Sequence, residues 1–216
     1  MLLDPLWELF IDRLFSCSSN DRLFNQYRDE DPALDVPGAA AIRRDNLRRY
    51  LASFQAAPSM LVVSEAAGYR GGRFSGVPLV SERMLVAGGP HALTGRPTSL
   101  GRPYAEATAT IFRRVIGIAD PSPFVWNTVP LHPHHPGQPL TNRTPAKSEI
   151  AAFAPLLGEV VCLVRPRLVV ALGRQAEHSL SQLNVDHLAV RHPANGGAAA
   201  FEHGMRRAMG MVRFQT

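Results

Sequence analysis

Apolar residues in this chain follow two patterns. Four short runs, at residues 60–63, 124–129, 168–172 and 187–190, are almost entirely apolar and are followed or interrupted by small and polar residues. Such runs predict buried strands of a parallel sheet. Elsewhere apolar residues recur at helical spacing, which predicts helices at residues 4–15, 40–54, 104–118, 146–164, 173–183 and 198–211.

The order of these elements predicts the fold class. Two helices come first, and strands then alternate with helices. This order favours an α/β fold, a three-layer α/β/α sandwich around a central four-stranded, mostly parallel sheet. The length of 216 residues and the 45% hydrophobic content predict a single domain over residues 1–216, with residues 1–40 as an N-terminal helical arm. Thr144, followed by Pro145, is expected to cap the next helix.

The composition bears on whether the chain spans a membrane, carries a signal peptide or forms a disulfide. No window approaches about eighteen consecutive apolar residues, so we expect no membrane span. The first residues include an acid and no basic region, so we expect no signal peptide. Cys17 and Cys162 lie in apolar helical patterns, which predicts buried free thiols and a reducing compartment. Two cysteines alone cannot hold an iron–sulfur cluster.

The chain is basic, and this favours a polyanionic partner. Its net charge is +5 and its pI is about 9.9. Lys147 is the only lysine, and arginine suits bidentate contact with phosphate. A GC-rich genome, which encodes arginine wherever a cation is tolerated, explains the same bias equally well.

Polar residues occur where the predicted strands end. Glu65 follows the first strand, Asn127 lies within the second, and His192 follows the fourth. Ligands bind outside the carboxyl ends of the strands in open α/β sheets, so we expect a carboxylate, an amide and an imidazole to converge on one pocket. Small residues after Glu65 let the backbone turn sharply and present N–H groups there. Each residue also has an ordinary interpretation: a surface glutamate, an asparagine that pins a loop, and a common His-Pro turn.

Two long irregular segments, residues 64–103 and 131–144, separate the first strands and helices. Loops of this length inside a compact domain are usually functional. The second contains His132, His134 and His135, which could ligate zinc. Zinc motifs usually separate their ligands by two or more residues, so we expect no metal. A metal-dependent hydrolase built on the loop from His132 to His135 remains an alternative.

Taken in order, the motifs of residues 60–205 resemble the uracil-DNA glycosylase superfamily. The matching segments are Ser64-Glu65-Ala66-Ala67-Gly68, Ser75-Gly76-Val77-Pro78-Leu79, Trp126-Asn127-Thr128-Val129, Val169-Val170-Ala171-Leu172-Gly173 and Arg191-His192-Pro193-Ala194. Each segment is weak alone, and their order and spacing carry the resemblance.

The resemblance implies a DNA repair glycosylase that flips uracil, or a related deaminated base, out of DNA and hydrolyses its N-glycosidic bond to leave an abasic site. It implies that Glu65 positions the water. It also implies that His192, with backbone N–H groups around Ala66–Tyr69, donates to the departing base. It implies no cofactor, a partner that is single- or double-stranded uracil-containing DNA, and a monomer in the bacterial cytoplasm, associated with the nucleoid.

The resemblance also assigns candidate contacts. Those for the substrate are Ser64, Ala66, Ala67, Gly68, Tyr69, Phe74, Leu79 and Asn127. Those for DNA are Arg70, Arg73, Arg174, Arg191, Asn195 and Gly196.

Several residues depart from the family pattern. Ala66 replaces the aspartate or asparagine of many members, and Ala67 replaces the usual proline. Leu79 stands where many members place the phenylalanine that stacks on the base, so we expect Phe74 or Tyr69 to stack instead. These departures, and the missing cysteine cluster of the iron–sulfur members, indicate a divergent branch.

Two further alternatives stay open at this point. One is a superfamily member that binds uracil DNA without turnover, or traps it covalently through His132 or His134. The other is a non-catalytic nucleotide-binding module, for which replacing Glu65 by glutamine would leave function intact.

Overall fold

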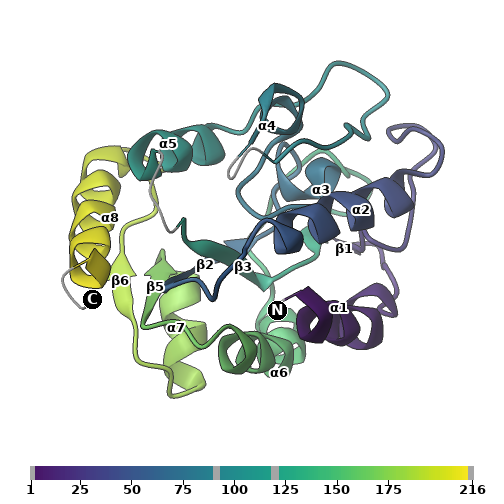
Figure 1. Ribbon diagram of the computed structural model, residues 1–216. Coiled ribbons are helices and arrows are strands. Elements are labelled where there is room, and N and C mark those ends of the chain that lie inside the picture. The colour runs from purple at the N-terminus through teal and green to yellow at the C-terminus, as the bar shows by residue number, and fades with distance from the viewer. Residues whose placement is uncertain (1–2, 90–92, 118–121, 214–216) are drawn as a thin grey trace.

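The chain folds around one parallel sheet (Figure 1). The computed structural model describes residues 3–89, 93–117 and 122–213. Four strands pair in the order β3-β2-β5-β6, and each pair is parallel: β2 Met60–Ala66, β3 Phe124–Val129, β5 Leu168–Leu172 and β6 Leu188–Val190. The predicted α/β sandwich with a four-stranded parallel sheet is confirmed.

The strand order creates a crevice at one edge of the sheet. β2 lies between β3 and β5, so the chain first adds a strand on one side of β2 and later adds strands on the other. Such a reversal opens a crevice outside the carboxyl ends of neighbouring strands. The register places Ser64 level with Asn127, and Leu172 level with Val190. The segments that follow the strands therefore meet at one end of the sheet.

Helices cover both faces of the sheet. On one face pack α1 Leu3–Phe10, α2 Ala39–Ala52, α6 Lys147–Val164 and α7 Arg174–Gln182, and on the other pack α5 Ala107–Ile116 and α8 Ala198–Arg213. Along β2, Leu61 and Val63 join the first core, whereas Met60 and Val62 join the second. This alternation is the period of two that a strand imposes. Within the described ranges no helix is long and apolar enough to cross a membrane.

Short elements occupy the connections between these helices and strands. The π-helix η1 Ile11–Phe15 continues α1. β1 Leu23–Phe24 pairs antiparallel with β4 His132–Pro133. Two short helices, α3 Gly72–Ser75 and α4 Glu82–Ala87, lie within the segment predicted to be an irregular loop.

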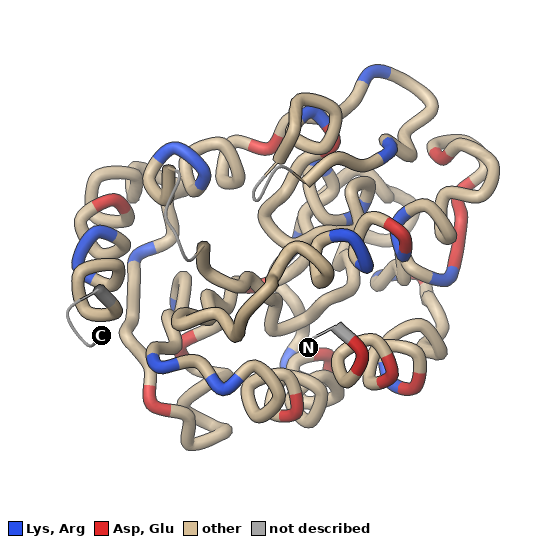
Figure 2. The backbone as a smooth tube through the Cα atoms, viewed as in Figure 1, with Lys and Arg blue, Asp and Glu red and all other residues tan. Residues whose placement is uncertain are grey.

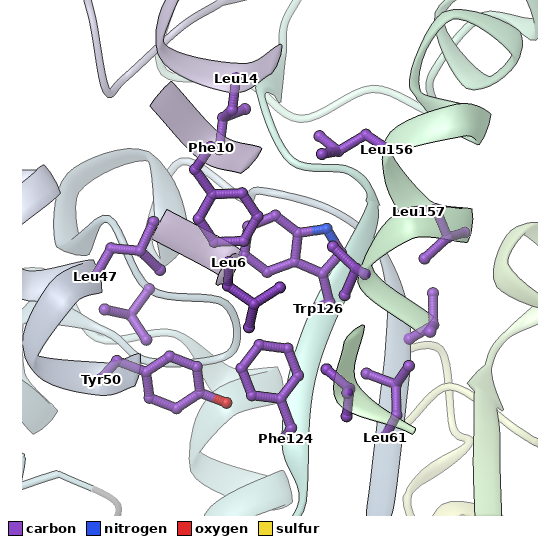
Figure 3. Close-up of a cluster of buried hydrophobic side chains, with 14 of the residues drawn as sticks. Leu6, Phe10, Leu14, Leu47, Tyr50, Leu61, Phe124, Trp126, Leu156 and Leu157 are labelled. Atoms are coloured by element: carbon purple, nitrogen blue, oxygen red, sulfur yellow. The ribbon is translucent and has the colours of Figure 1, made fainter. Parts of the chain in front are cut away.

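The N-terminal segment is part of the core, so the prediction of a separate arm over residues 1–40 is wrong. Leu6, Phe10 and Leu14 are fully buried in the same cluster as Trp126 of β3. The Phe10 ring stacks on the Trp126 indole with centroids 4.5 Å apart and planes 5° from parallel (Figure 3). Helical spacing correctly predicts an apolar face here, but it does not say which surface that face covers.

Two local predictions also need correction. α6 begins at Lys147 with Ala146 as its N-cap, because the Glu149 carboxylate accepts the Ala146 N–H at 2.7 Å; Thr144 lies outside the helix. Both cysteines are free, but Cys162 is exposed and Cys17 is half-buried, so neither is the buried thiol that was predicted. The apolar neighbours of Cys162 on α6 face the core, whereas its own position faces solvent.

Candidate active site at the carboxyl ends of the strands

A cavity of about 160 Å³ lies where β2 ends. It is lined by Ser64, Glu65, Ala66, Ala67, Gly68, Leu79, Glu106, Thr108, Pro133, Asn142, Arg143 and His192. Seven of the predicted site residues are in this set, and they come from three separate segments of the chain: the end of β2, the segment after α3 and the loop after β6. The convergence of Glu65 and His192 on one pocket is therefore observed.

A second cavity, of about 440 Å³, adjoins the first. Its lining is Glu65, Thr144, Leu172, Gly173, Arg174, Gln175, Arg191, His192, Ala194 and Asn195. Glu65 and His192 line both cavities, so they form the wall between them. Arg174, Arg191 and Asn195, three of the predicted DNA contacts, gather on the larger side.

Asn127 lies on β3 beside Ser64 of β2. It is 3% exposed in β3, and its Oδ1 accepts a hydrogen bond from the Ser64 hydroxyl on the neighbouring strand. Within the described residues its Nδ2 has no hydrogen-bond partner, so the amide retains donor capacity. Ser64 lines the smaller cavity, whereas Asn127 lines neither cavity and is linked to the smaller one through Ser64, so the amide does not reach the pocket in the way expected.

Glu65 is a half-buried carboxyl at the tip of β2. Burial raises its pKa above the usual range, and a hydrogen bond from Thr144 partly offsets the rise. A carboxyl with a raised pKa at the edge of a cavity suits a group that accepts a proton from water.

The surroundings of His192 favour its neutral imidazole form. Burial lowers its pKa, and the positive charge of Arg191 lowers it further. Its Nδ1 accepts the Ala194 N–H at 3.2 Å, so the proton of the neutral ring lies on Nε2. The Cβ of His192 packs closely against Gly173, where a methyl group would lie 3.3 Å from it. The tautomer leaves Nε2–H as a hydrogen-bond donor.

Glu106, at the N-cap of α5, also lines the smaller cavity. Burial raises the pKa of its carboxyl to about 7. Among the described residues, no hydrogen bond or ion pair to this carboxyl is present. The carboxyl lies against Gly68, where an added Cβ would be 2.7 Å from Oε1.

The turn after β2 is held by side chains from β4 and from the loop between β4 and α6. The Tyr69 N–H donates to Asn142 Oδ1 at 2.9 Å. It was expected to donate to the departing base, and it is not free to do so. His132 is buried, with Nδ1 2.8 Å from the Ala67 carbonyl oxygen and Nε2 3.0 Å from that of Pro139. Burial lowers its pKa to about 4.

Contacts with backbone carbonyl oxygens give His132 and His134 a structural role in the loop. Both ring nitrogens of His132 face backbone carbonyls, and His134 Nδ1 lies 3.0 Å from the His135 carbonyl oxygen. Within the described part of the chain, no three His, Cys, Asp or Glu side chains are grouped as metal ligands. His132 instead fixes the backbone beneath the cavity.

Two predicted contacts face the interior instead of the cavity. Phe74 is fully buried and stacks on Tyr104 with centroids 4.8 Å apart, so it does not reach a base. The Arg73 side chain is 1% exposed, pairs with Asp35 at 2.6 Å and lies over the rings of Phe24 and Phe74. The prediction that Arg73 contacts DNA is therefore wrong, because α3 turns these side chains inward.

The remaining candidates differ in their access to the cavities. Leu79 lines the smaller cavity with a backbone φ of +50°, a strained conformation for a non-glycine residue. Tyr69 is half-buried, and Arg70 is exposed above its ring. Gly196 follows Asn195 in the turn after His192 and lines neither cavity. Leu79, Phe74 and Tyr69 are the three candidates for stacking on the base. Of these, only Leu79 is among the residues that line the smaller cavity.

Sequence reasoning missed Glu106, Thr108, Pro133, Asn142 and Arg143, which complete the smaller cavity. Glu106 is an acid at the start of a helix, a common and uninformative placement. Asn142 and Arg143 lie in the irregular segment after β4, where the histidines are the more conspicuous feature of the sequence. Their roles depend on tertiary contacts such as the Tyr69–Asn142 hydrogen bond.

Comparisons with known proteins show the family and the fold of this chain. The family model described as the Uracil DNA glycosylase superfamily matches residues 74–207. The solved structure titled the crystal structure of WT Pedobacter heparinus SMUG2 is similar, with a TM-score of 0.66. The alignment has 13% sequence identity and covers 96% of this chain and 97% of that chain. A search of curated proteins finds no match.

Proposed function

Because this chain belongs to the uracil-DNA glycosylase superfamily, we propose that it excises uracil, or a related deaminated base, from DNA by hydrolysing the N-glycosidic bond. The observation that carries the proposal is that Glu65 and His192 together form the wall between two adjoining cavities. One cavity suits a flipped base, and the other has arginines for the nucleic-acid backbone. Enzymes that act on a base must first remove it from the stack.

The chemistry follows from the charges that develop. As the bond from C1′ to the base nitrogen breaks, its electron pair stays on the base and the sugar becomes an electrophile. A water positioned by the Glu65 carboxylate bonds to C1′ and passes its proton to that carboxylate. The Nε2–H of His192 stabilises negative charge on a carbonyl oxygen of the departing base.

Recognition of the base is assigned to the pair formed by Asn127 and Ser64. The Ser64 hydroxyl donates a hydrogen bond to Asn127 Oδ1. This bond orients the amide so that its Nδ2 remains available as a donor. A donor favours the carbonyl oxygen of a deaminated base over the amino group of the normal base. Leu79 supplies the apolar surface at the cavity.

The DNA backbone is assigned to the larger cavity. Arg174 and Arg191 supply positive charge there, and Asn195 adds a short polar contact. Such contacts position the enzyme without reading sequence. Arg70, exposed beside the turn after β2, and Gly196 extend the proposed DNA surface. We propose that the protein acts as a monomer at the nucleoid and needs no metal or redox cofactor.

The test uses EDTA-treated protein and a labelled oligonucleotide with one uracil, single- and double-stranded, followed by alkali to cut abasic sites. We expect more than one turnover per protein. Glu65→Gln should slow excision about 10²–10⁴-fold, and His192→Ala about 10²–10³-fold. Glu8→Gln, at an exposed position of α1, is the matched control and should match the parent.

Other outcomes discriminate the alternatives. No turnover, with uracil DNA retained through denaturing electrophoresis, would indicate a covalent trap. Dependence on added zinc would favour a metal-dependent hydrolase. Neither excision nor retention, with any deaminated base, would contradict the proposal.

A further inference from the structure

The proposed reaction leaves Glu106 without a role. The titratable or charged groups that line the smaller cavity are Glu65 from β2, Glu106 from the start of α5, Arg143 from the loop before α6 and His192 from the loop after β6. Arg143 is engaged by Glu149, with 2.5 Å between Nη2 and Oε1. Glu65 and His192 already have assigned functions. Glu106 therefore brings an additional carboxyl to the cavity.

The local backbone makes room for this carboxyl. A Cβ on Gly68 would lie 2.7 Å from Glu106 Oε1, and a Cβ on Gly71 would collide with Oε2. Because these two residues are glycines, they leave a space that the Glu106 carboxyl occupies. This space adjoins the turn that follows Glu65. Glu65 and Glu106 therefore line the same cavity, which is the one proposed for the base.

The surroundings of Glu106 favour a neutral carboxylic acid. Within the described residues its carboxyl has no ion pair and no hydrogen bond, and burial raises its pKa to about 7. Near neutral pH a large share of the molecules therefore carry a proton on this side chain. An ionised carboxylate only accepts hydrogen bonds, whereas a protonated one can also donate.

We propose that Glu106 is a second catalytic residue, the acid that gives a proton to the departing base. This inference rests on the proposed glycosylase function. When the bond between C1′ and the base nitrogen breaks, its electron pair stays on the base, and Glu106 supplies the proton that makes the base leave neutral. Water forms the new C1′–O bond and gives a proton to Glu65. One proton has then moved from Glu106 to Glu65, and exchange with solvent resets both carboxyls.

The test compares two leaving groups under single-turnover conditions. 5-Fluorouracil leaves more readily as an anion than uracil, so its excision needs less help from an acid. Glu106→Gln should slow uracil excision about 10²–10⁴-fold. The loss should be at least about tenfold smaller for 5-fluorouracil, because protonation by Glu106 matters less there. Glu65→Gln should lose activity to a similar degree on both substrates.

The pH profile supplies a second readout. An acid must hold its proton, so wild-type excision of uracil should fall as pH rises through the pKa of Glu106, at about 7. That decline should be absent in Glu106→Gln. At lower pH, activity should fall as Glu65 becomes protonated, and this limb should persist in the variant.

A second variant keeps the test informative if Glu106→Gln folds poorly. Gly68→Ala leaves the carboxyl in the protein but places a methyl group against Oε1. It should also slow uracil excision more than 5-fluorouracil excision. Circular dichroism and the melting temperature, with Glu8→Gln as control, check that each variant is folded.

Each result bears on one of the two proposals. If the parent protein excises uracil while Glu106→Gln stays within about threefold of it, Glu106 is not the acid. An equal loss on both bases would also overturn the role, because it would indicate a structural effect. If the parent protein excises no base at all, the glycosylase proposal fails, and the role of Glu106 fails with it.

Discussion

Glu65 and Glu106 present two carboxyls to one cavity in different surroundings. Burial raises the pKa of both, but Glu65 also receives a hydrogen bond from Thr144, which stabilises its charged form. No such contact reaches Glu106 within the described residues. Acid and base roles commonly fall to paired groups whose environments separate their pKa values. This difference supports the proposed roles of Glu65 as the base and Glu106 as the acid, and the two roles together predict the bell-shaped pH dependence described above.

Asn127 supplies a separate prediction at the residue scale. Asn127→Ala should lower the rate of uracil excision about 10–100-fold, because it removes the proposed donor to the base and leaves the Ser64 hydroxyl without its acceptor. The measurement is kcat/KM on a uracil oligonucleotide.

Thr128→Val is the matched control on the same strand. Its hydroxyl is buried and has no hydrogen-bond partner among the described residues, so its removal should leave excision unchanged. Equal losses in the two variants would mean that disturbance of β3, rather than the amide, causes the effect.

Site residues at the ends of strands are easier to predict from the sequence than site residues that a helix brings to the cavity. Glu65, Asn127 and His192 follow or lie within buried strands, and parallel strands bring their ends together whatever the rest of the fold does. Glu106 reaches the cavity only because α5 starts beside Gly68. Arg73 fails for the converse reason, because α3 points it at Asp35.

At the scale of elements, α1 and η1 act as part of the core that supports β3. The strand that carries Asn127 also carries Trp126, whose indole lies against Phe10 (Figure 3). Apolar runs predicted the strands, because both faces of this sheet are covered. The position of α1 was not predictable in this way, because an amphipathic helix can cover any apolar surface. Residues before α2 therefore position the site through β3.

Phe10→Ala tests this coupling between α1 and β3. Removing a buried phenylalanine typically costs about 3–5 kcal/mol of unfolding free energy. For a chain of this size each kcal/mol lowers the melting temperature by about 2–4 °C, so we expect a drop of roughly 6–20 °C. Thermal unfolding followed by tryptophan fluorescence measures it.

Ile11→Ala is the control for the Phe10 variant, because Ile11 is the next residue along the chain and is 44% exposed. It should change the melting temperature by only a degree or two. A similarly small effect of Phe10→Ala would show that the N-terminal helix contributes little to the core.

At the scale of the whole molecule, the net charge of +5 is spread over the surface and does not by itself locate DNA. Figure 2 shows basic residues on α2, α5 and α8 as well as near the strand ends. Any of these surfaces would attract a polyanion. The larger cavity differs because Arg174 and Arg191 gather there beside Glu65 and His192.

Salt dependence distinguishes a local DNA site from general attraction. The logarithm of affinity for uracil-free duplex should fall linearly with the logarithm of salt concentration, with a slope of about −0.9 per phosphate contact. Arg174→Ala should weaken binding and make the slope shallower by about one.

Arg49→Ala is the control and should change neither the affinity nor the slope. Arg49 is exposed near the end of α2, pairs with Asp45 at 2.8 Å and precedes the amino end of β2. Fluorescence anisotropy between about 50 and 200 mM salt gives both slopes. If Arg49→Ala reduces the slope and Arg174→Ala does not, DNA binds the face that carries α2, and the proposal that the larger cavity holds the DNA backbone is wrong.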